Sequence, residues 1–379
     1  MADKSKVREP LFRIKKKDGM AGWKTWAVRL GAVAISLIVC SFVIVLLTDV
    51  NPIEFFAQMI EGSFGDSKKV FKMLQSVAIL LCISLAVTPA FKMKFWNIGA
   101  EGQVIVGGLA AAACMKYLTP VTTGMSAAEI SAASARVIIA MAITSVLAGM
   151  IWGIIPAIFK AHFNTNETLF TLMMNYIAIQ LTAFMIAVWV PSGSQVVGVI
   201  NRQSKIGWLP ELFGQKYVIN IIVVLVVMVL IYIYLKHSKH GYEISVVGES
   251  ENTARYIGIN VKKVIIRTMA ISGAICGIAG FLLVAGTDHS ISVETAGGDG
   301  FTAIMVSWLA QFNPFVMMFT SFIISFLEIG AGQIATTFGL NQSVAEILSG
   351  IIIFFIIGSE FFINYRIDFR KKHAKEEGK

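Results

Sequence analysis

Long uninterrupted apolar segments constrain this chain more than any other feature of its sequence. They run for about 18 to 24 residues, the length that an α-helix needs to cross a hydrocarbon core of about 30 Å. Strands of an outer-membrane barrel would alternate apolar and polar residues over about ten positions, and these segments do not alternate. Hydrophobic residues make up 56% and charged residues only 15% of the 379 residues. The sequence therefore predicts an all-α polytopic membrane protein.

The apolar pattern predicts about ten transmembrane helices. They are 27–48, 71–90, 97–117, 136–159, 168–190, 217–235, 264–286, 301–312, 315–331 and 341–363. Basic segments occur at both ends of the chain, and an even number of crossings places both ends in the cytoplasm. We therefore expect a basic cytoplasmic tail over 1–26, a transmembrane domain over 27–363 with a cytoplasmic loop at 236–263, and a second basic tail over 364–379.

The formal net charge of +9 lies mainly in the two tails and in the 236–263 loop. This is the positive-inside bias of membrane proteins, and contact with anionic lipid explains it without nucleic acid. Cys40, Cys82, Cys114 and Cys276 lie singly in apolar segments and are expected to be core residues. His289 is one histidine near acidic residues, so we expect no metal. No cofactor or catalytic residue is expected, and no phosphate-binding loop is present for ATP.

Two polar motifs occur twice, in the same order. Gly99-Ala100-Glu101-Gly102 matches Gly297-Gly298-Asp299-Gly300, and Phe163-x-x-Asn166-Glu167-Thr168 matches Phe338-x-x-Asn341-Gln342-Ser343. In the expected topology the two copies enter the membrane from opposite sides. The sequence therefore predicts an inverted repeat of spans two to five and seven to ten, an architecture in which substrate passes between the copies near the midplane.

Polar residues at membrane depth are costly and are candidates for a substrate path. They are Trp96, Asn97, Glu101, Gln103, Asn166, Glu167, Asp299, Asn341, Gln342 and Glu346. Structural alternatives stay open: Asn166 and Glu167 suit a helix N-terminus, as does Asp299. Glu101 has Asn97 one turn before it on the same helix face, whereas Gln103 points elsewhere. Trp96 and Trp308 suit an interfacial belt, although Trp96 beside the first motif also suits stacking on a flat ligand.

The segment from Gly241 to Asn260 resembles the coupling segment of ABC-importer permeases of the branched-chain amino acid, ribose and nucleoside superfamily. It contains the pattern G-x-x-x-N-x-A-x-x-x-G-I, and Arg255 stands where the family commonly has alanine. Phe95-Trp96-Asn97-Ile98-Gly99-Ala100-Glu101-Gly102-Gln103 resembles the other signature of the family, in the form of the nucleoside permeases. Asn166-Glu167-Thr168 through Met174-Asn175-Tyr176 is similar to the next block. The resemblance covers about residues 70 to 363.

The resemblance implies a permease subunit in a bacterial cell membrane, without ATPase activity of its own. Its implied partners are a second permease in a heterodimer, a cytoplasmic ABC ATPase and an external substrate-binding lipoprotein. The implied ATPase-coupling residues are Gly248, Glu249, Asn252, Ala254, Arg255 and Gly258, and we expect a short helix from about 248 to 258.

Amides and a nearby tryptophan suit an uncharged substrate such as a nucleoside. A ribose or other sugar permease and an ion-coupled secondary transporter are the alternatives, followed by an intramembrane enzyme or a membrane-anchored assembly subunit.

Overall fold

The computed structural model describes residues 12–17, 22–47, 51–121, 124–190 and 196–369. It divides into two compact units, one formed by residues 1–62 and 327–379 and the other by residues 63–326. Both copies of the glycine motif lie in the larger unit, whereas the asparagine motif has one copy in each unit.

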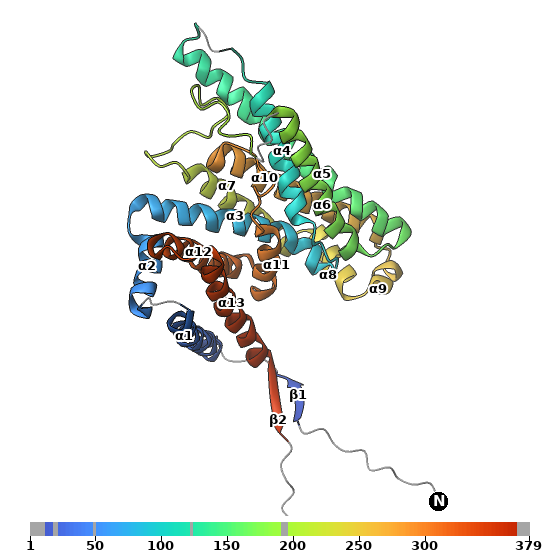
Figure 1. Cartoon of the computed structure of the whole chain (residues 1–379). Helices are drawn as coiled ribbons and strands as arrows, with labels where there is room; N and C mark the ends of the chain where they lie inside the picture. The colour runs from blue at the N-terminus through green and yellow to red at the C-terminus, as the bar shows by residue number, and fades with distance from the viewer. Residues whose placement is uncertain (1–11, 18–21, 48–50, 122–123, 191–195, 370–379) are drawn as a thin grey trace, which may run out of the picture. The chain divides into compact units, whose positions relative to one another are not determined.

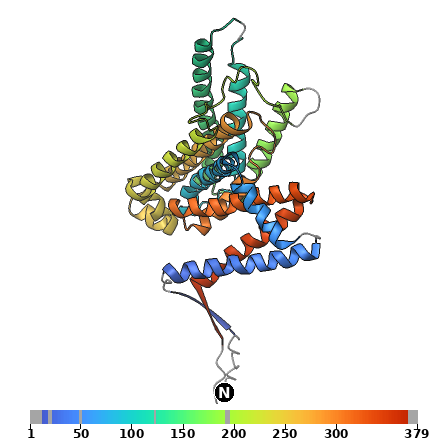
Figure 2. The same ribbon diagram turned by 90° about the vertical axis from the view of Figure 1, so that its left-hand side faces the viewer.

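In the described part of the larger unit every regular element is a helix (Figure 1). Its elements are α3 (Ser67–Lys92), α4 (Ala100–Tyr117), α5 (Ala127–Phe163), α6 (Glu167–Trp189), α7 (Val218–His237), α8 (Lys239–Glu249), α9 (Glu251–Tyr256), α10 (Val261–Leu283), the π-helical turn η1 (Val284–Asp288), α11 (Asp299–Leu309) and the first half of α12 (Pro314–Phe338). In Figures 1 and 2 the short helices α8 and α9 lie far from the N-terminal end of α5.

The smaller unit combines helices with a short ribbon. It contains β1 (Phe12–Lys16), α1 (Gly22–Leu47), most of α2 (Pro52–Phe64), the second half of α12, α13 (Gln342–Asn364) and β2 (Tyr365–Phe369). The helix α1 packs along α13. β1 pairs antiparallel with β2, with Phe12 opposite Phe369 (Figure 2). This ribbon was not predicted, because its residues were assigned to the two basic tails.

Within the described residues, seven helices are long and apolar enough to cross a membrane: α1, α3, α5, α6, α7, α10 with η1, and α12. The chain is therefore a multi-pass membrane protein. Each of the ten predicted spans contains a helix, but α4, α11 and α13 are not among the seven. In particular α11 has 11 residues, and a helix of that length at about 1.5 Å per residue is too short to cross by itself.

Glycines allow α10 to approach two neighbouring helices at backbone distance. A Cβ atom at Gly277 would overlap the backbone of Ser145 on α5, and one at Gly280 would overlap the backbone of Val104 on α4. Gly149 on α5 faces Gly273 on α10 in the same way. In a membrane the hydrophobic effect does not drive helices together, because lipid is as apolar as their side chains. Helices associate there through close packing, which small residues allow. As a result α10 is the central helix of the larger unit and holds α4 and α5 in place.

Candidate functional site

The two glycine motifs meet directly at the junction of α4 and α11. Glu101 lies in the first turn of α4, and its Oε1 accepts a hydrogen bond of 2.9 Å from the Gly298 N–H. Its Oε2 accepts one of 2.8 Å from the Gly300 N–H. Gly298 has a φ of +85°, in the left-handed region that glycine adopts without strain. The carboxylate therefore caps the start of α11, which Asp299 begins.

The segment before α4 folds differently from the prediction. Since α4 begins at Ala100, Asn97 lies outside the helix, where its Oδ1 accepts from the Gly99 N–H at 3.0 Å and from Gln103 Nε2 at 3.4 Å. Its Nδ2 donates to Ser272 Oγ on α10 at 3.2 Å. The expected alignment of Asn97 with Glu101 on one helix face was therefore wrong, as was a Gln103 pointing elsewhere. A short asparagine side chain competes for nearby backbone N–H groups and favours such a turn over helix.

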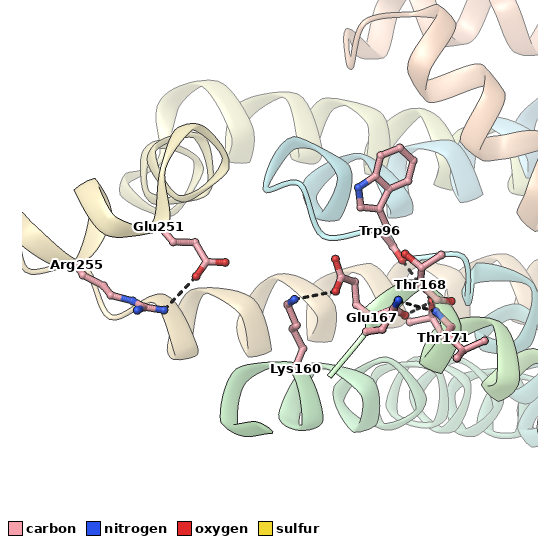
Figure 3. Close-up of polar contacts among 9 residues, drawn as sticks. Trp96, Lys160, Glu167, Thr168, Thr171, Glu251 and Arg255 are labelled. Atoms are coloured by element: carbon pink, nitrogen blue, oxygen red, sulfur yellow. Dashed lines mark hydrogen bonds and ion pairs between the residues drawn. The ribbon is translucent and has the colours of Figure 1, made fainter. Parts of the chain in front are cut away.

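Two residues of α6 satisfy the backbone of this non-helical segment. Asn175 accepts from the Gly102 N–H and donates to the Ile98 carbonyl, both at 2.9 Å. Thr171 Oγ1 accepts from the Ile98 N–H at 3.1 Å. Both side chains are buried, and Figure 3 shows Thr171 beside Trp96. Thr171 was missed, although its spacing of four residues from Asn175 places the two on one helix face.

Aromatic residues surround the other end of α11. The rings of Trp96 and Trp308 stack with centroids 5.6 Å apart and planes inclined by 24°, and Phe91 contacts both tryptophans edge-on. Trp96 is 46% and Trp308 47% exposed, so the pair offers a large aromatic surface. The prediction treated Trp308 as a membrane-belt residue, because nothing in the sequence connects it with Trp96.

The second motif pair caps two helices. Asn166 precedes α6, and its Oδ1 accepts from the Leu169 N–H at 3.1 Å. Asn341 precedes α13, and its Oδ1 accepts from the Ser343 N–H at 3.0 Å. Glu167 forms an ion pair of 2.8 Å with Lys160 (Figure 3). The side chains of Gln342 and Glu346 lie outside the described part of the structure. The helix-cap alternative therefore fits both asparagines.

The predicted helix from 248 to 258 is divided in two. Ser250 ends α8 and begins α9, where its Oγ accepts from the Thr253 N–H at 3.2 Å. A Cβ at Gly248 would overlap the backbone of Lys92, and Ala254 is fully buried. Serine competes with helical hydrogen bonding and favours such a cap. One continuous helix was therefore wrong, and Gly248 and Ala254 contact this chain itself.

The exposed surface of this segment comes from other positions. Glu249, Asn252, Arg255 and Gly258 are exposed, and Tyr256, which was not singled out, is 92% exposed. The exposed pair Glu251–Arg255 is bridged at 3.1 Å (Figure 3).

A cavity of about 750 Å³ lies beside this surface, between the end of α5, α9 and the start of α10. Four basic residues are among those that line it, Lys160, His162, Arg255 and Lys262.

Comparison with known proteins agrees with these features. The guanosine ABC transporter permease protein NupP of Bacillus subtilis (strain 168) is 29% identical over 88% of this chain and 92% of its own length. The glucose ABC transporter permease protein TsgB13 of Haloferax volcanii is 24% identical over 91% of this chain and 90% of its own. The nucleoside ABC transporter permease protein NupB of Lactococcus lactis subsp. cremoris is 25% identical over 83% and 86%.

No solved structure matches the chain. The family described as branched-chain amino acid transport system / permease component matches residues 69–357. This range is most of the chain and includes every motif discussed above, but not the two tails. The chain therefore belongs to this family of ABC transporter permeases, whose members carry substrate across a membrane and leave ATP hydrolysis to a partner.

Proposed function

We propose that this permease translocates nucleosides that an external binding lipoprotein delivers. The observation that carries the proposal is the half-exposed Trp96–Trp308 pair beside the first glycine motif. An aromatic surface suits the flat face of a nucleobase, where stacking contributes about 1 to 3 kcal/mol per base. The names of NupP and NupB support the same substrate class.

Sugar transport is the second candidate, supported by the similarity to TsgB13, a glucose permease. A competition assay separates the two, with vesicles that contain the whole transporter and a radiolabelled nucleoside. We expect excess unlabelled nucleoside to block uptake and excess ribose to leave it nearly unchanged. If ribose competes as well as the nucleoside, the permease transports sugars. The ion-coupled transporter is not retained, because the family works with an ATP-hydrolysing partner.

The path itself is proposed to run past the polar residues of the two motif pairs. Amides at Asn166 and Asn341 and the carboxylate of Asp299 are its candidate lining, together with Gln342 and Glu346. Asn97 and Gln103 are buried and hydrogen-bonded to each other, so in this proposal they support the segment before α4. In this proposal the chain has ten spans in an inverted repeat, and both termini are cytoplasmic. The matching caps of α6 and α13, and the acid in the first turn of both α4 and α11, support the repeat.

The surface of α9 and the neighbouring basic cavity are proposed to receive the cytoplasmic ATPase. A second permease is proposed to complete a heterodimer, since both NupP and NupQ, two guanosine permease proteins of Bacillus subtilis, resemble this chain. The exposed ring of Tyr256 is the best contact position, whereas Gly248 and Ala254 would disturb the fold when changed.

Cysteine crosslinking tests the ATPase surface. A cysteine in place of Tyr256 should crosslink to the ATPase in the assembled complex. Phe213 is 88% exposed and lies in the connection between α6 and α7, which the proposed topology places outside, so a cysteine there is the matched control. A crosslink from position 213 and none from position 256 would overturn both the coupling surface and the topology.

A further inference from the structure

The contacts of Glu101 leave little of its carboxylate for a substrate. Each oxygen accepts an N–H from the start of α11, at 2.9 Å and 2.8 Å. The residue is only 7% exposed. Charge-assisted bonds to backbone N–H groups at a helix N-terminus are among the stronger hydrogen bonds in proteins. This geometry is that of a carboxylate that stabilises a helix N-terminus, and not that of a side chain available to bind substrate.

The backbones of α4 and α11 also touch at this junction. A Cβ atom at Gly300 would overlap the backbone of Glu101, so glycine at 300 is required for the carboxylate to reach its two donors. The far end of α11 is held by the same stretch of chain, because Trp308 stacks on Trp96. Residues 96 to 101 therefore fix both ends of α11, which is an 11-residue helix.

We propose that Glu101 is a positioning residue: its carboxylate fixes α11 to α4, so that the two helices move as one body during transport and Trp308 stays against Trp96. This inference depends on the transport function, but not on which substrate is carried. It assigns to Glu101 a role different from that of the other acid of the repeat, Asp299, which stays a candidate for the path itself.

The test compares Glu101→Gln with Glu101→Asp in the full transporter. The glutamine keeps the size of the side chain but turns an NH₂ group toward an N–H donor, and it lacks the charge. We expect maximal uptake to fall by about tenfold or more, at an unchanged KM for the loaded binding protein. The aspartate keeps the charge and should restore part of the rate. A raised KM for the loaded binding protein at an unchanged maximal rate would instead make Glu101 a substrate ligand and overturn the proposal.

A second readout follows the helix itself. The Trp96–Trp308 pair should give a near-ultraviolet circular dichroism signal that Trp308→Phe removes. Glu101→Gln should weaken the same signal, whereas Glu101→Asp should keep most of it. An unchanged signal in Glu101→Gln would show that the carboxylate does not position α11.

Gly300→Ala provides an independent route to the same junction. We expect Gly300→Ala to reduce maximal uptake as Glu101→Gln does. The uptake of the double variant should be no lower than that of either single variant, because both substitutions remove the same interaction. Gly332→Ala is the control, since a Cβ there meets nothing within 4 Å. Fully additive losses at normal membrane abundance would contradict a shared junction.

Discussion

Arg267 on α10 donates a hydrogen bond of 2.8 Å to the carboxylate of Glu243 on α8. The side chains are 29% and 16% exposed, so the pair is partly shielded from water. It ties α8, the first helix of the 236–263 segment, to the central helix of the larger unit. A movement imposed on α8 by a partner would therefore reach α10, which packs on α3, α4 and α5.

Removal of this pair should destabilise the protein in a pH-dependent way. Arg267 lowers the pKa of Glu243 by its hydrogen bond, so the pair stabilises the fold above the pKa of a free glutamate and loses this effect as pH falls through the lowered pKa. We expect Glu243→Gln to cost about 1 kcal/mol near neutral pH and less in acid. Thermal unfolding of the purified protein at several pH values measures this.

The exposed pair Glu251–Arg255 supplies the control for that experiment, with side chains 49% and 63% exposed. Glu251→Gln should change the Tm very little, since exposed pairs contribute little to stability. Equal decreases in Tm in the two variants would show that the partial burial of the Glu243–Arg267 pair does not increase its contribution to stability.

The glycine contacts of α10 predict a severe effect from a single methyl group. Gly277→Ala would place a Cβ atom on the backbone of Ser145, and neither helix backbone yields without losing other contacts. Overpacking of this kind typically costs about 1 to 3 kcal/mol. We expect a lower yield of monodisperse protein and a lower Tm. Gly350→Ala meets nothing within 4 Å and should behave like the native chain; a normal Tm in Gly277→Ala would contradict the packing.

The aromatic pair predicts a change in selectivity. If Trp308 stacks on the base, Trp308→Ala should raise the KM for a nucleoside by about tenfold, in line with the usual energy of one base stack. The preference of the permease for the nucleoside over ribose should fall as well. Uptake competition measures both quantities. Trp23 is 72% exposed on α1, and Trp23→Ala should leave selectivity intact. Equal selectivity in all three proteins would remove the aromatic pair from the substrate path.

The apolar segments were sufficient to predict most of the helices, because their length and composition are local properties of the chain. The asparagine caps were also predictable, since Asn166 and Asn341 act on N–H groups two or three residues away. By contrast, the contact of Glu101 with Gly298 joins residues 197 positions apart, and no periodicity reports such a pairing. Equivalence of the two motifs in sequence did not reveal that they touch.

The predicted helix boundaries were wrong where polar side chains compete with backbone carbonyls for N–H groups. The Asn97 side chain accepts from the Gly99 N–H, and α4 begins only at Ala100. Ser250 divides the 236–263 segment between α8 and α9. Thr171 was overlooked for a different reason. A threonine in an apolar helix carries no signal of its own, and its role depends on the Ile98 N–H, which donates to it across 73 positions of the sequence.

The ring of His289 stacks on Trp208 with centroids 3.7 Å apart and planes inclined by 4°. The carbonyl of His289 accepts from the Ile200 N–H at 2.8 Å, and Trp208 Nε1 donates to the Ile200 carbonyl at 3.0 Å. The stack therefore holds the connection between α6 and α7 against the end of η1. Burial lowers the pKa of His289 to about 4, so the imidazole is neutral in the folded protein.

Acid should loosen this connection through His289. The unfolded histidine binds a proton near pH 6.5 and the folded one only near pH 4. The contribution of the neutral His289 ring to the free energy of unfolding is therefore fully present above about pH 6.5 and is lost as pH decreases toward 4. His289→Phe keeps a flat ring but cannot titrate, and its Tm should fall less between pH 7 and pH 4 than that of the native protein. His162→Phe removes an exposed imidazole and should follow the native curve. Parallel curves for His289→Phe and the native chain would show that this stack does not make the fold sensitive to acid.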